Sequence, residues 1–288
     1  MKVLITGKNG LLAGRLKEAL SARKISCTSI NGINMSSYIN DKYDYIIHAA
    51  SPNSEDCNNE EISKRYVEES KKLVEAAINK GVRRFIFLSS TQVYNGLNNN
   101  LLHENLKLPE AGNKYIQIKK TIENFLLRKE ISSKISPIIL RISNGYGSPV
   151  DKNSKCWHLL AMDVCRKAIK NGQITLNSNG EGYKDFIPIT NICSSIENIM
   201  IKNIDTGIYN LATGDSLKII TFVGKIKSIL EHKTGNEINI NINKDQLMSI
   251  EKYIYDNSKL TNILGQSTVN HQNEIDRLID FCITHFFN

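Results

Sequence analysis

Residues 1–14 read MKVLITGKNGLLAG, and this stretch decides the fold. Its first six residues form a short β-rich run, and a helical pattern opens after the glycines. Gly7 and Gly10, followed by the small Ala13, let the backbone turn tightly and approach a pyrophosphate at the N-terminus of the helix. A strand, a glycine-rich turn and a helix in this order indicate a dinucleotide-binding unit in a doubly wound, mostly parallel α/β sheet. The candidate cofactor contacts in this turn are Gly7, Asn9, Gly10, Leu11 and Leu12.

The second predicted strand, residues 25–30, should end beside the adenosine ribose of that cofactor. A carboxylate there would bind the ribose 2′-hydroxyl and favour NAD. The segment offers amide and hydroxyl side chains instead, with Asn31 as the candidate contact, and no carboxylate before Asp41. No arginine follows the strand to clamp a 2′-phosphate, although Arg15 on the first helix could reach it. The pattern slightly favours NADP(H) over NAD(H).

The third predicted strand, around residues 43–48, ends in the small residues Ala49, Ala50 and Ser51. Their size would let the cofactor lie against the backbone, and all three are candidate cofactor contacts. His48 could act as a catalytic base, but a histidine within an apolar strand is more often packed and hydrogen-bonded. We therefore expect His48 to be structural.

Residues 85–94, FIFLSSTQVY, carry the expected chemistry. The apolar run ends at Leu88 and gives way to hydroxyl side chains, among them Ser90 and Thr91. Such a run suits a buried parallel strand, and open α/β sheets place their sites at the carboxyl ends of strands. We expect Leu88 to contact the cofactor and Ser90 to reach the substrate.

Tyr115 and Lys119 would lie one turn apart on one face of a helix. A free tyrosine has a pKa near ~10, and a nearby ammonium favours the phenolate and lowers that pKa. Ser90 could hydrogen-bond the same substrate oxygen. Together the three side chains could move a proton at a carbinol or carbonyl while a hydride moves elsewhere. Alone, the Tyr–Lys spacing would suit any surface helix, and its context favours the catalytic interpretation.

Further motifs follow in order along the chain: HAAS at 48–51, SSTQVY at 89–94, YIQIK at 115–119, LRISNGYG at 140–147, GEGYKDFIPITNI at 180–192 and IYNLATG at 208–214. With TGKNGLLA at 6–13, they make the chain resemble the extended short-chain dehydrogenase/reductases that act on nucleotide sugars, from residue 1 to about 265. The resemblance implies a catalytic triad of Ser90, Tyr115 and Lys119. Tyr115 would be the acid or base, Lys119 would lower its pKa and bind the nicotinamide ribose, and Ser90 would hold the reacting oxygen.

The resemblance also implies the organisation of the chain. Residues 1–147 and about 186–213 would form a Rossmann-type dinucleotide-binding domain. Residues 148–185 and about 214–288 would form a smaller C-terminal α/β lobe that binds the nucleotide-diphosphate sugar. A homodimer through two helices of the first domain and a place in polysaccharide biosynthesis are further expectations from the same family.

The residues beside the serine bear on the reaction type. Nucleotide-sugar 4,6-dehydratases of this family carry Asp-Glu after the triad Ser or Thr, but this chain has Thr91 and Gln92, which cannot transfer protons near neutral pH. A dehydratase is therefore not expected. A reductase of a nucleotide-linked 4-keto-6-deoxy sugar and a 4-epimerase with tightly bound NAD both remain. The short chain and the lack of an acidic ribose ligand favour the reductase. A non-catalytic NADP-binding regulator is disfavoured because Tyr115 and Lys119 are both present.

Substrate contacts are implied by the same resemblance. Thr91 and Gln92 would shape the sugar pocket, and Asn144 would touch the substrate unless it only forms a turn. Related GDP-fucose synthases have a cysteine at the position of Thr91 and a histidine acid fourteen residues after the position of Asn144, where this chain has His158. His158 could equally be an ordinary helix-start histidine. Lys184 stands where the family has an arginine for the diphosphate; it keeps the charge but loses the bidentate fork.

Composition limits the remaining function classes. The chain has 288 residues and six cysteines without CxxC or Cys/His metal spacing, so we expect reduced thiols and no metal. No run reaches the ~18 apolar residues of a membrane span, and no signal peptide precedes the first strand, so a cytoplasmic protein without membrane partners is expected.

The net charge of +8 comes from 37 Lys and Arg against 29 Asp and Glu. The lysines are dispersed, which suits small anions rather than nucleic acid.

Overall fold

The computed structural model describes residues 1–32, 34–53 and 55–286, and within these ranges six parallel strands form one central sheet. Their order is β2 (Ser26–Ile30), β1 (Lys2–Thr6), β3 (Tyr45–His48), β4 (Arg84–Ser90), β6 (Ser136–Ile142) and β11 (Gly207–Leu211). The chain continues from β1 to β2 on one side and then crosses to β3 on the other. This reversal makes a crevice at the carboxyl ends of β1 and β3. The predicted doubly wound parallel sheet is confirmed.

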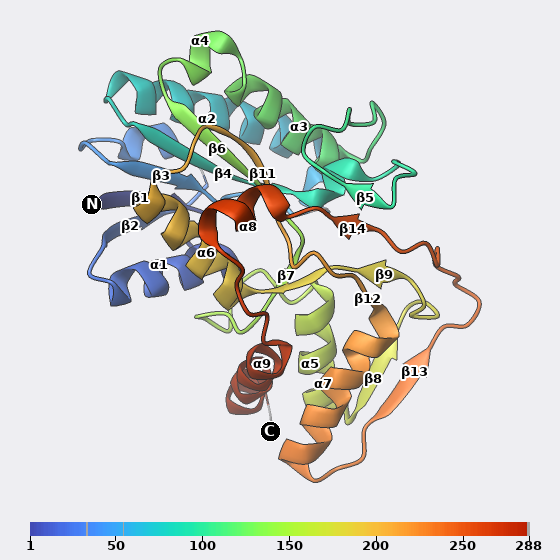
Figure 1. The fold of residues 1–288 in the computed structure, drawn as a ribbon. Coiled ribbons are helices and arrows are strands. Elements are labelled where there is room, and N and C mark those ends of the chain that lie inside the picture. Colours follow the sequence, from blue (N-terminus) through green and yellow to red (C-terminus); the bar gives the residue numbers. More distant parts are fainter. Residues whose placement is uncertain (33, 54, 287–288) are drawn as a thin grey trace.

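Helices cover both faces of the sheet (Figure 1). One layer contains α1 (Leu11–Ala22) and α6 (Ile189–Lys202), and the other contains α2 (Glu60–Asn79), α3 (Lys114–Leu126) and the short α4 (Lys129–Ser132). Successive strand residues point to opposite faces, so Val3 and Ile5 pack in one buried cluster and Leu4 in the other. Burial on both faces explains why these strands are continuous apolar runs in the sequence.

A smaller lobe lies beside one helical layer (Figure 1). It contains α5 (Leu160–Asn171), β8 (Gln173–Leu176), α7 (Ile219–Thr234), β13 (Asn239–Ile242) and α9 (His271–Phe286). Strands β8 and β13 pair in parallel. Met162, Phe222 and Leu278 of this lobe belong to the same buried cluster as Val3 and Ile5. One continuous apolar core therefore joins the lobe to the central sheet.

Short strand pairs connect the two parts of the chain. They are β7 (Asn144–Tyr146) with β10 (Phe186–Pro188), β9 (Tyr183–Lys184) with β12 (Leu217–Lys218), and β5 (Leu101–Leu102) with β14 (Ile254–Tyr255). Three 3₁₀ segments of the described chain are η1 (Met35–Tyr38), η2 (Asp56–Asn58) and η3 (Thr91–Tyr94). After β14, α8 (Ser258–Leu264) packs against β11 and α6. The chain from 254 to 264 therefore returns to the central sheet after leaving the small lobe.

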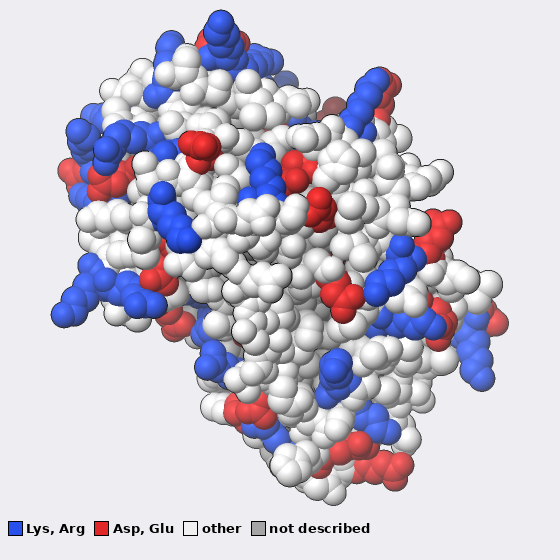
Figure 2. All heavy atoms as spheres, in the orientation of Figure 1, with Lys and Arg blue, Asp and Glu red and all other residues white. Residues whose placement is uncertain are grey.

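Charged side chains are mixed over the surface. On the face that Figure 2 shows, Lys and Arg are scattered among Asp and Glu and form no continuous basic stripe. Among the helices of the described ranges, none combines the length and apolar character that crossing a bilayer requires.

Candidate active site

A cleft opens at the carboxyl ends of β1, β3 and β4. It consists of a first cavity of about 630 Å³ that includes Asn9, Asn31 and Ala50, and a second cavity of about 530 Å³ that includes Ser90 and Lys184. The two cavities share Gly10, Ala49, Ser51, Gln92, Tyr115, Lys155, His158 and Leu159. They therefore form one continuous cleft around Tyr115, at the crevice where the sheet order reverses.

The glycine-rich turn shapes the floor of the first cavity. Gly7 has φ +86°, and a Cβ atom on it would lie 2.8 Å from the backbone nitrogen of Ala50, so a larger residue cannot replace it without moving the chain. Gly10 precedes α1 without a side-chain cap. The first amides of a helix have no intrahelical acceptor, so those of Leu11 and Leu12 can face an anion in the cleft. This uncapped helix start fits the pyrophosphate of a dinucleotide.

The far end of the first cavity differs in part from the sequence prediction. Asn31 lines it, as expected, together with Gly32. Arg15 is not among its described lining residues, and its guanidinium pairs with Glu18 on α1 at 3.3 Å. Asp56 and Arg65 also line this cavity. They lie on η2 and α2 rather than after β2, so the second-strand pattern could not reveal them.

Ser90, Tyr115 and Lys119 all line the second cavity. Ser90 is the last residue of β4, and the other two lie on α3, whose N-cap Asn113 accepts a hydrogen bond from the amide of Ile116 at 3.0 Å. The Lys119 ammonium donates to the Leu88 carbonyl at 2.8 Å and lies 5.5 Å from the centroid of the Tyr115 ring. The fold thus brings the three predicted catalytic side chains together, with Leu88 beside them.

The acid–base properties of Tyr115 depart from expectation. Burial raises the pKa of Tyr115 to about 12, although a hydrogen bond with Ser90 acts to lower it. Burial also lowers the pKa of Lys119 to about 8, against the attraction of the Glu123 carboxylate. Because the ammonium lies against the tyrosine ring and bonds to a carbonyl, the predicted lowering of the Tyr115 pKa is not found. Tyr115 is therefore a protonated phenol at neutral pH, which is the state of a proton donor.

His48 is structural, as expected. Its side chain is fully buried, and its two ring nitrogens lie 2.8 Å from the Thr6 hydroxyl and 2.9 Å from the Ser70 hydroxyl. Burial lowers its pKa to about 3. His48 is absent from the linings of both cavities in the described chain.

The predicted substrate residues gather on the wall of the second cavity. Thr91 and Gln92 begin η3 there, and Asn144 is held by a hydrogen bond from its side-chain amide to the Asp185 carbonyl at 2.9 Å. His158 lies exposed in the turn that precedes α5 and contributes to both cavities.

Two further residues of this wall, Tyr253 and Tyr255, were not predicted from the sequence. They come from the segment that returns to pair with β5, and Tyr255 lies with its ring centroid 6.0 Å from that of Tyr94. No motif around them signals this position, because only the return of the chain to β5 brings them to the cleft.

The charge of the second cavity is one-sided. Its described lining contains Lys119, Lys155, Lys184 and His158, and no Asp or Glu. Lys184 on β9 is partly buried, which lowers its pKa, and neither it nor Lys155 takes part in any ion pair found within the described ranges. Such a cavity suits an anionic ligand and holds no carboxylate to act on it.

Residues 3–212 match the family model described as the NAD dependent epimerase/dehydratase family. The chain belongs to this family. This assignment confirms the resemblance seen in the motifs and the expectation of an enzyme. Within the described residues, no group of three or more His, Cys, Asp or Glu side chains is arranged to hold a metal ion.

Solved structures of similar fold belong to proteins with different activities and different bound ligands. The epimerase/dehydratase fold of this chain resembles an NAD dependent NDP-hexosamine 5,6-dehydratase, TunA, of tunicamycin biosynthesis (17% identity, 99% of each chain, TM-score 0.80). It also resembles UDP-glucose 4-epimerase from Bifidobacterium longum in complex with NAD⁺ and UDP (17%, 99% of each chain, 0.80). A third is RMD from Pseudomonas aeruginosa complexed with NADPH (15%, 99% of each chain, 0.79). A search of curated protein sequences found no match.

Proposed function

We propose that this enzyme is an NAD(P)H-dependent reductase that delivers hydride to C4 of a nucleotide-linked 4-keto-6-deoxy sugar. The observation that carries the proposal is the protonated Tyr115 beside Ser90 in a cavity whose described lining has no carboxylate. Dehydration needs an acid and a base at the sugar, and the described lining of the second cavity offers no carboxylate to serve as either. Reduction of a carbonyl needs one proton donor, which Tyr115 provides.

The side chains have complementary roles in this reaction. Ser90 and Tyr115 hold the carbonyl oxygen, and Tyr115 transfers its proton to that oxygen as the hydride arrives. The dinucleotide, when bound over the start of α1, supplies the hydride to the carbonyl carbon. Lys119 would stabilise the phenolate that remains and would hold the nicotinamide ribose. Thr91 and Gln92 shape the space around the sugar ring, together with Tyr253 and Tyr255 on the same wall.

For the cofactor, we favour NADP(H) slightly over NAD(H). Arg65 in the first cavity supports the choice, because a guanidinium can clamp a 2′-phosphate. Asp56 in the same cavity works against it, and the similar structures include both an NADPH complex and NAD complexes.

The nucleotide-diphosphate sugar would occupy the second cavity and the small lobe. Lys184 and Lys155 support this placement, since each offers an ammonium without a carboxylate partner to a diphosphate. The division of the chain into a dinucleotide domain (1–147 and about 186–213) and a sugar lobe (148–185 and about 214–288) remains part of the proposal. So does a homodimer through α2 and α3, which would cover the exposed Leu127 that follows α3.

A 4-epimerase with tightly bound NAD is the second candidate. It would use the same three side chains, with Tyr115 first removing and then returning a proton. The similar fold of a UDP-glucose 4-epimerase with NAD⁺ supports it.

A turnover assay separates the two functions. We expect purified enzyme to consume NADPH, and NADH more slowly, with one member of a panel of dTDP-, GDP-, UDP- and CDP-linked 4-keto-6-deoxy sugars. Absorbance at the reduced-nicotinamide band gives the readout. The amount of NADPH or NADH consumed should equal the amount of sugar added. Interconversion of a 4-hydroxy sugar without net cofactor use would instead identify an epimerase.

Lys184→Gln tests the diphosphate contact. We expect KM for the sugar nucleotide to rise about tenfold, because a charge-assisted hydrogen bond contributes roughly 1.5–3 kcal/mol, while kcat stays within about twofold. Steady-state kinetics on Lys184→Gln and Lys184→Arg should show the arginine variant close to the parent. Lys227→Gln, which removes a lysine paired with Glu231 on α7, is the surface control. An unchanged KM in Lys184→Gln would place the diphosphate elsewhere.

A further inference from the structure

We infer that Glu123 and Arg141 are positioning residues, which hold the helix bearing Tyr115 and Lys119 in register with the strand that ends at Ser90. The inference rests on the proposed function, because it assigns these two residues to the same catalytic group. Neither residue lines the cleft in the described structure, so their effect is exerted through other side chains.

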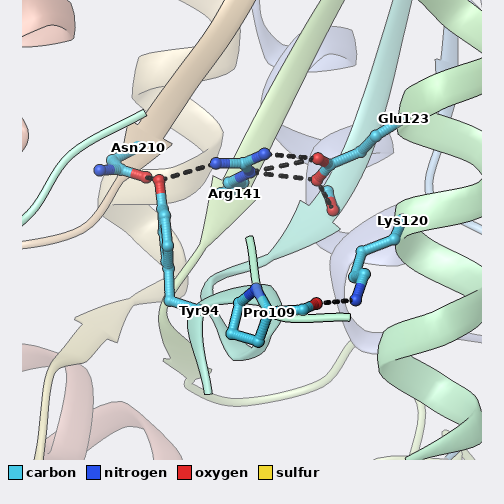
Figure 3. A network of polar contacts seen from close by, with 7 residues as sticks. Tyr94, Pro109, Lys120, Glu123, Arg141 and Asn210 are labelled. Carbon is cyan, nitrogen blue, oxygen red and sulfur yellow. Dashed lines mark hydrogen bonds and ion pairs between the residues drawn. The ribbon is translucent and has the colours of Figure 1, made fainter. Parts of the chain in front are cut away.

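Glu123 continues the series that Tyr115 and Lys119 begin. The three residues are spaced four apart on α3 and therefore share one face of the helix. Glu123 is 1% exposed, and Arg141 of β6 is 2% exposed. The Arg141 guanidinium donates to both carboxylate oxygens, at 3.2 Å from Nε to each and at 2.7 Å from Nη2 to Oε2 (Figure 3). This two-nitrogen contact fixes the angle between α3 and β6 as well as their distance.

The same carboxylate is bonded to the catalytic strand. The Ser89 hydroxyl donates to Oε1 of Glu123, and Ser89 directly precedes Ser90 on β4. One buried carboxylate thus joins β4, which carries Ser90, to α3, which carries Tyr115. Any shift of α3 along the sheet must break either the Ser89 bond or the Arg141 fork.

The network continues toward the substrate wall. Arg141 donates to the Tyr94 hydroxyl at 2.9 Å, and that hydroxyl donates to Asn210 Oδ1 at 2.8 Å (Figure 3). Asn210 Nδ2 then donates at 2.9 Å to the carbonyls of Leu102 and Asp256. Asp256 follows Tyr255, which lines the second cavity. The catalytic helix and the wall that would face the sugar are therefore tied to one set of buried polar contacts.

Packing alone does not require an ion pair at this position. Burying two charges is costly, and well-packed apolar residues of similar volume often stabilise a fold equally well or better. An apolar pair would fill the space but would not bond to Ser89 or Tyr94. The pair also affects the protonation of Lys119, because the Glu123 carboxylate raises the pKa of Lys119 while burial lowers it. The other groups that face Lys119 are the neutral His48 on β3, Cys57 on η2 and Tyr115 on α3 itself.

A double substitution distinguishes positioning from simple stabilisation. Glu123→Leu with Arg141→Met removes both charges, so we expect a folded protein whose unfolding midpoint and NADPH affinity stay close to the parent values. We expect kcat to fall about 10- to 100-fold, because small misplacement of reacting groups costs this much, with KM changed by less than about threefold. The alkaline limb of the pH profile should move to lower pH, since Lys119 loses the carboxylate that raises its pKa. Parental kcat and an unmoved limb in a stable double variant would overturn the inference.

Ser89→Ala keeps the ion pair and removes the bond between β4 and α3, at a residue that also lines the second cavity and is 5% exposed. We expect kcat to fall about fivefold or more with no movement of the alkaline limb, and an unchanged kcat would disprove the strand–helix coupling even if the double variant fails to fold. The control is Arg23→Met with Glu197→Leu, which removes a more exposed arginine–glutamate pair at 2.9 Å between the residue after α1 and α6. Its kcat should equal the parental value.

The proposed function and this inference can fail separately. Absence of turnover by the parental enzyme with every sugar would contradict the proposed function, and the Lys119 ammonium titration, followed by NMR without substrate, would still test the inference. A lower titration midpoint in the double variant supports it. An identical midpoint in a folded double variant would overturn it, whatever reaction the enzyme catalyses.

Discussion

Tyr115→Phe is expected to lower kcat by about 10³-fold, within the 10²- to 10⁴-fold range typical of a general acid, while NADPH binding changes little. The substitution removes only the hydroxyl. The ring keeps its place, with its centroid 5.5 Å from the Lys119 ammonium. The pKa of about 12 leaves Tyr115 protonated through the whole neutral range, so its loss removes the donor rather than a charge. An effect on kcat without an effect on cofactor affinity is the signature of a group used in the transition state.

Single-turnover absorbance and NADPH fluorescence titration together measure this effect. Tyr209→Phe provides the control, since Tyr209 on β11 donates to the Asp205 carbonyl at 3.0 Å and does not line the cleft of the described chain. Its kcat should match the parent. If Tyr115→Phe retained parental turnover, the proton would have to come from another group and the proposed mechanism would be wrong.

Lys119→Met should produce the second large effect, a fall in kcat of about 10²-fold, accompanied by a changed pH profile. Burial depresses the pKa of Lys119 from its usual value to about 8, so the ammonium is present below pH 8 and is lost as the pH rises through it. Activity of the parental enzyme should therefore be level near neutral pH and decline above about 8. Tyr115 does not titrate in this window because its pKa is about 12.

Initial rates of the two proteins between pH 6 and 10 test this assignment. The methionine variant should show low activity without the decline near pH 8, since no lysine remains there to titrate. A decline that persists unchanged in Lys119→Met would assign the limb to a different group. NADPH affinity should also weaken, because Lys119 would bind the nicotinamide ribose.

Similar folds serve several reactions, so the fold alone does not identify this one. A 5,6-dehydratase and a 4-epimerase share the architecture of this chain at 17% identity each. In the second cavity of this cleft, Thr91 and Gln92 stand beside Ser90, and no carboxylate is found among the described lining residues. The choice between reductase and epimerase depends on how the sugar and cofactor are held, which the turnover panel measures.

The sequence by itself determined the architecture and the core of the site. Gly7 must be glycine because of its positive φ and the backbone of Ala50 beside it, and this constraint is local and visible as a motif. The apolar strand that ends at Ser90 and the four-residue spacing of Tyr115 and Lys119 are local as well, since strand burial and helical periodicity depend on neighbouring residues.

Only the tertiary structure decided the features that depend on contacts between distant segments. Arg65 replaces Arg15 at the cofactor cavity because α2 crosses there, while Arg15 is paired within α1. Tyr255 reaches the substrate wall because β14 returns to pair with β5. The pKa of Tyr115 rises rather than falls because burial outweighs its hydrogen bond with Ser90, while the Lys119 ammonium bonds to the Leu88 carbonyl. Strand pairing, burial and side-chain contacts depend on segments that are distant in the sequence. No local sequence pattern can therefore predict them.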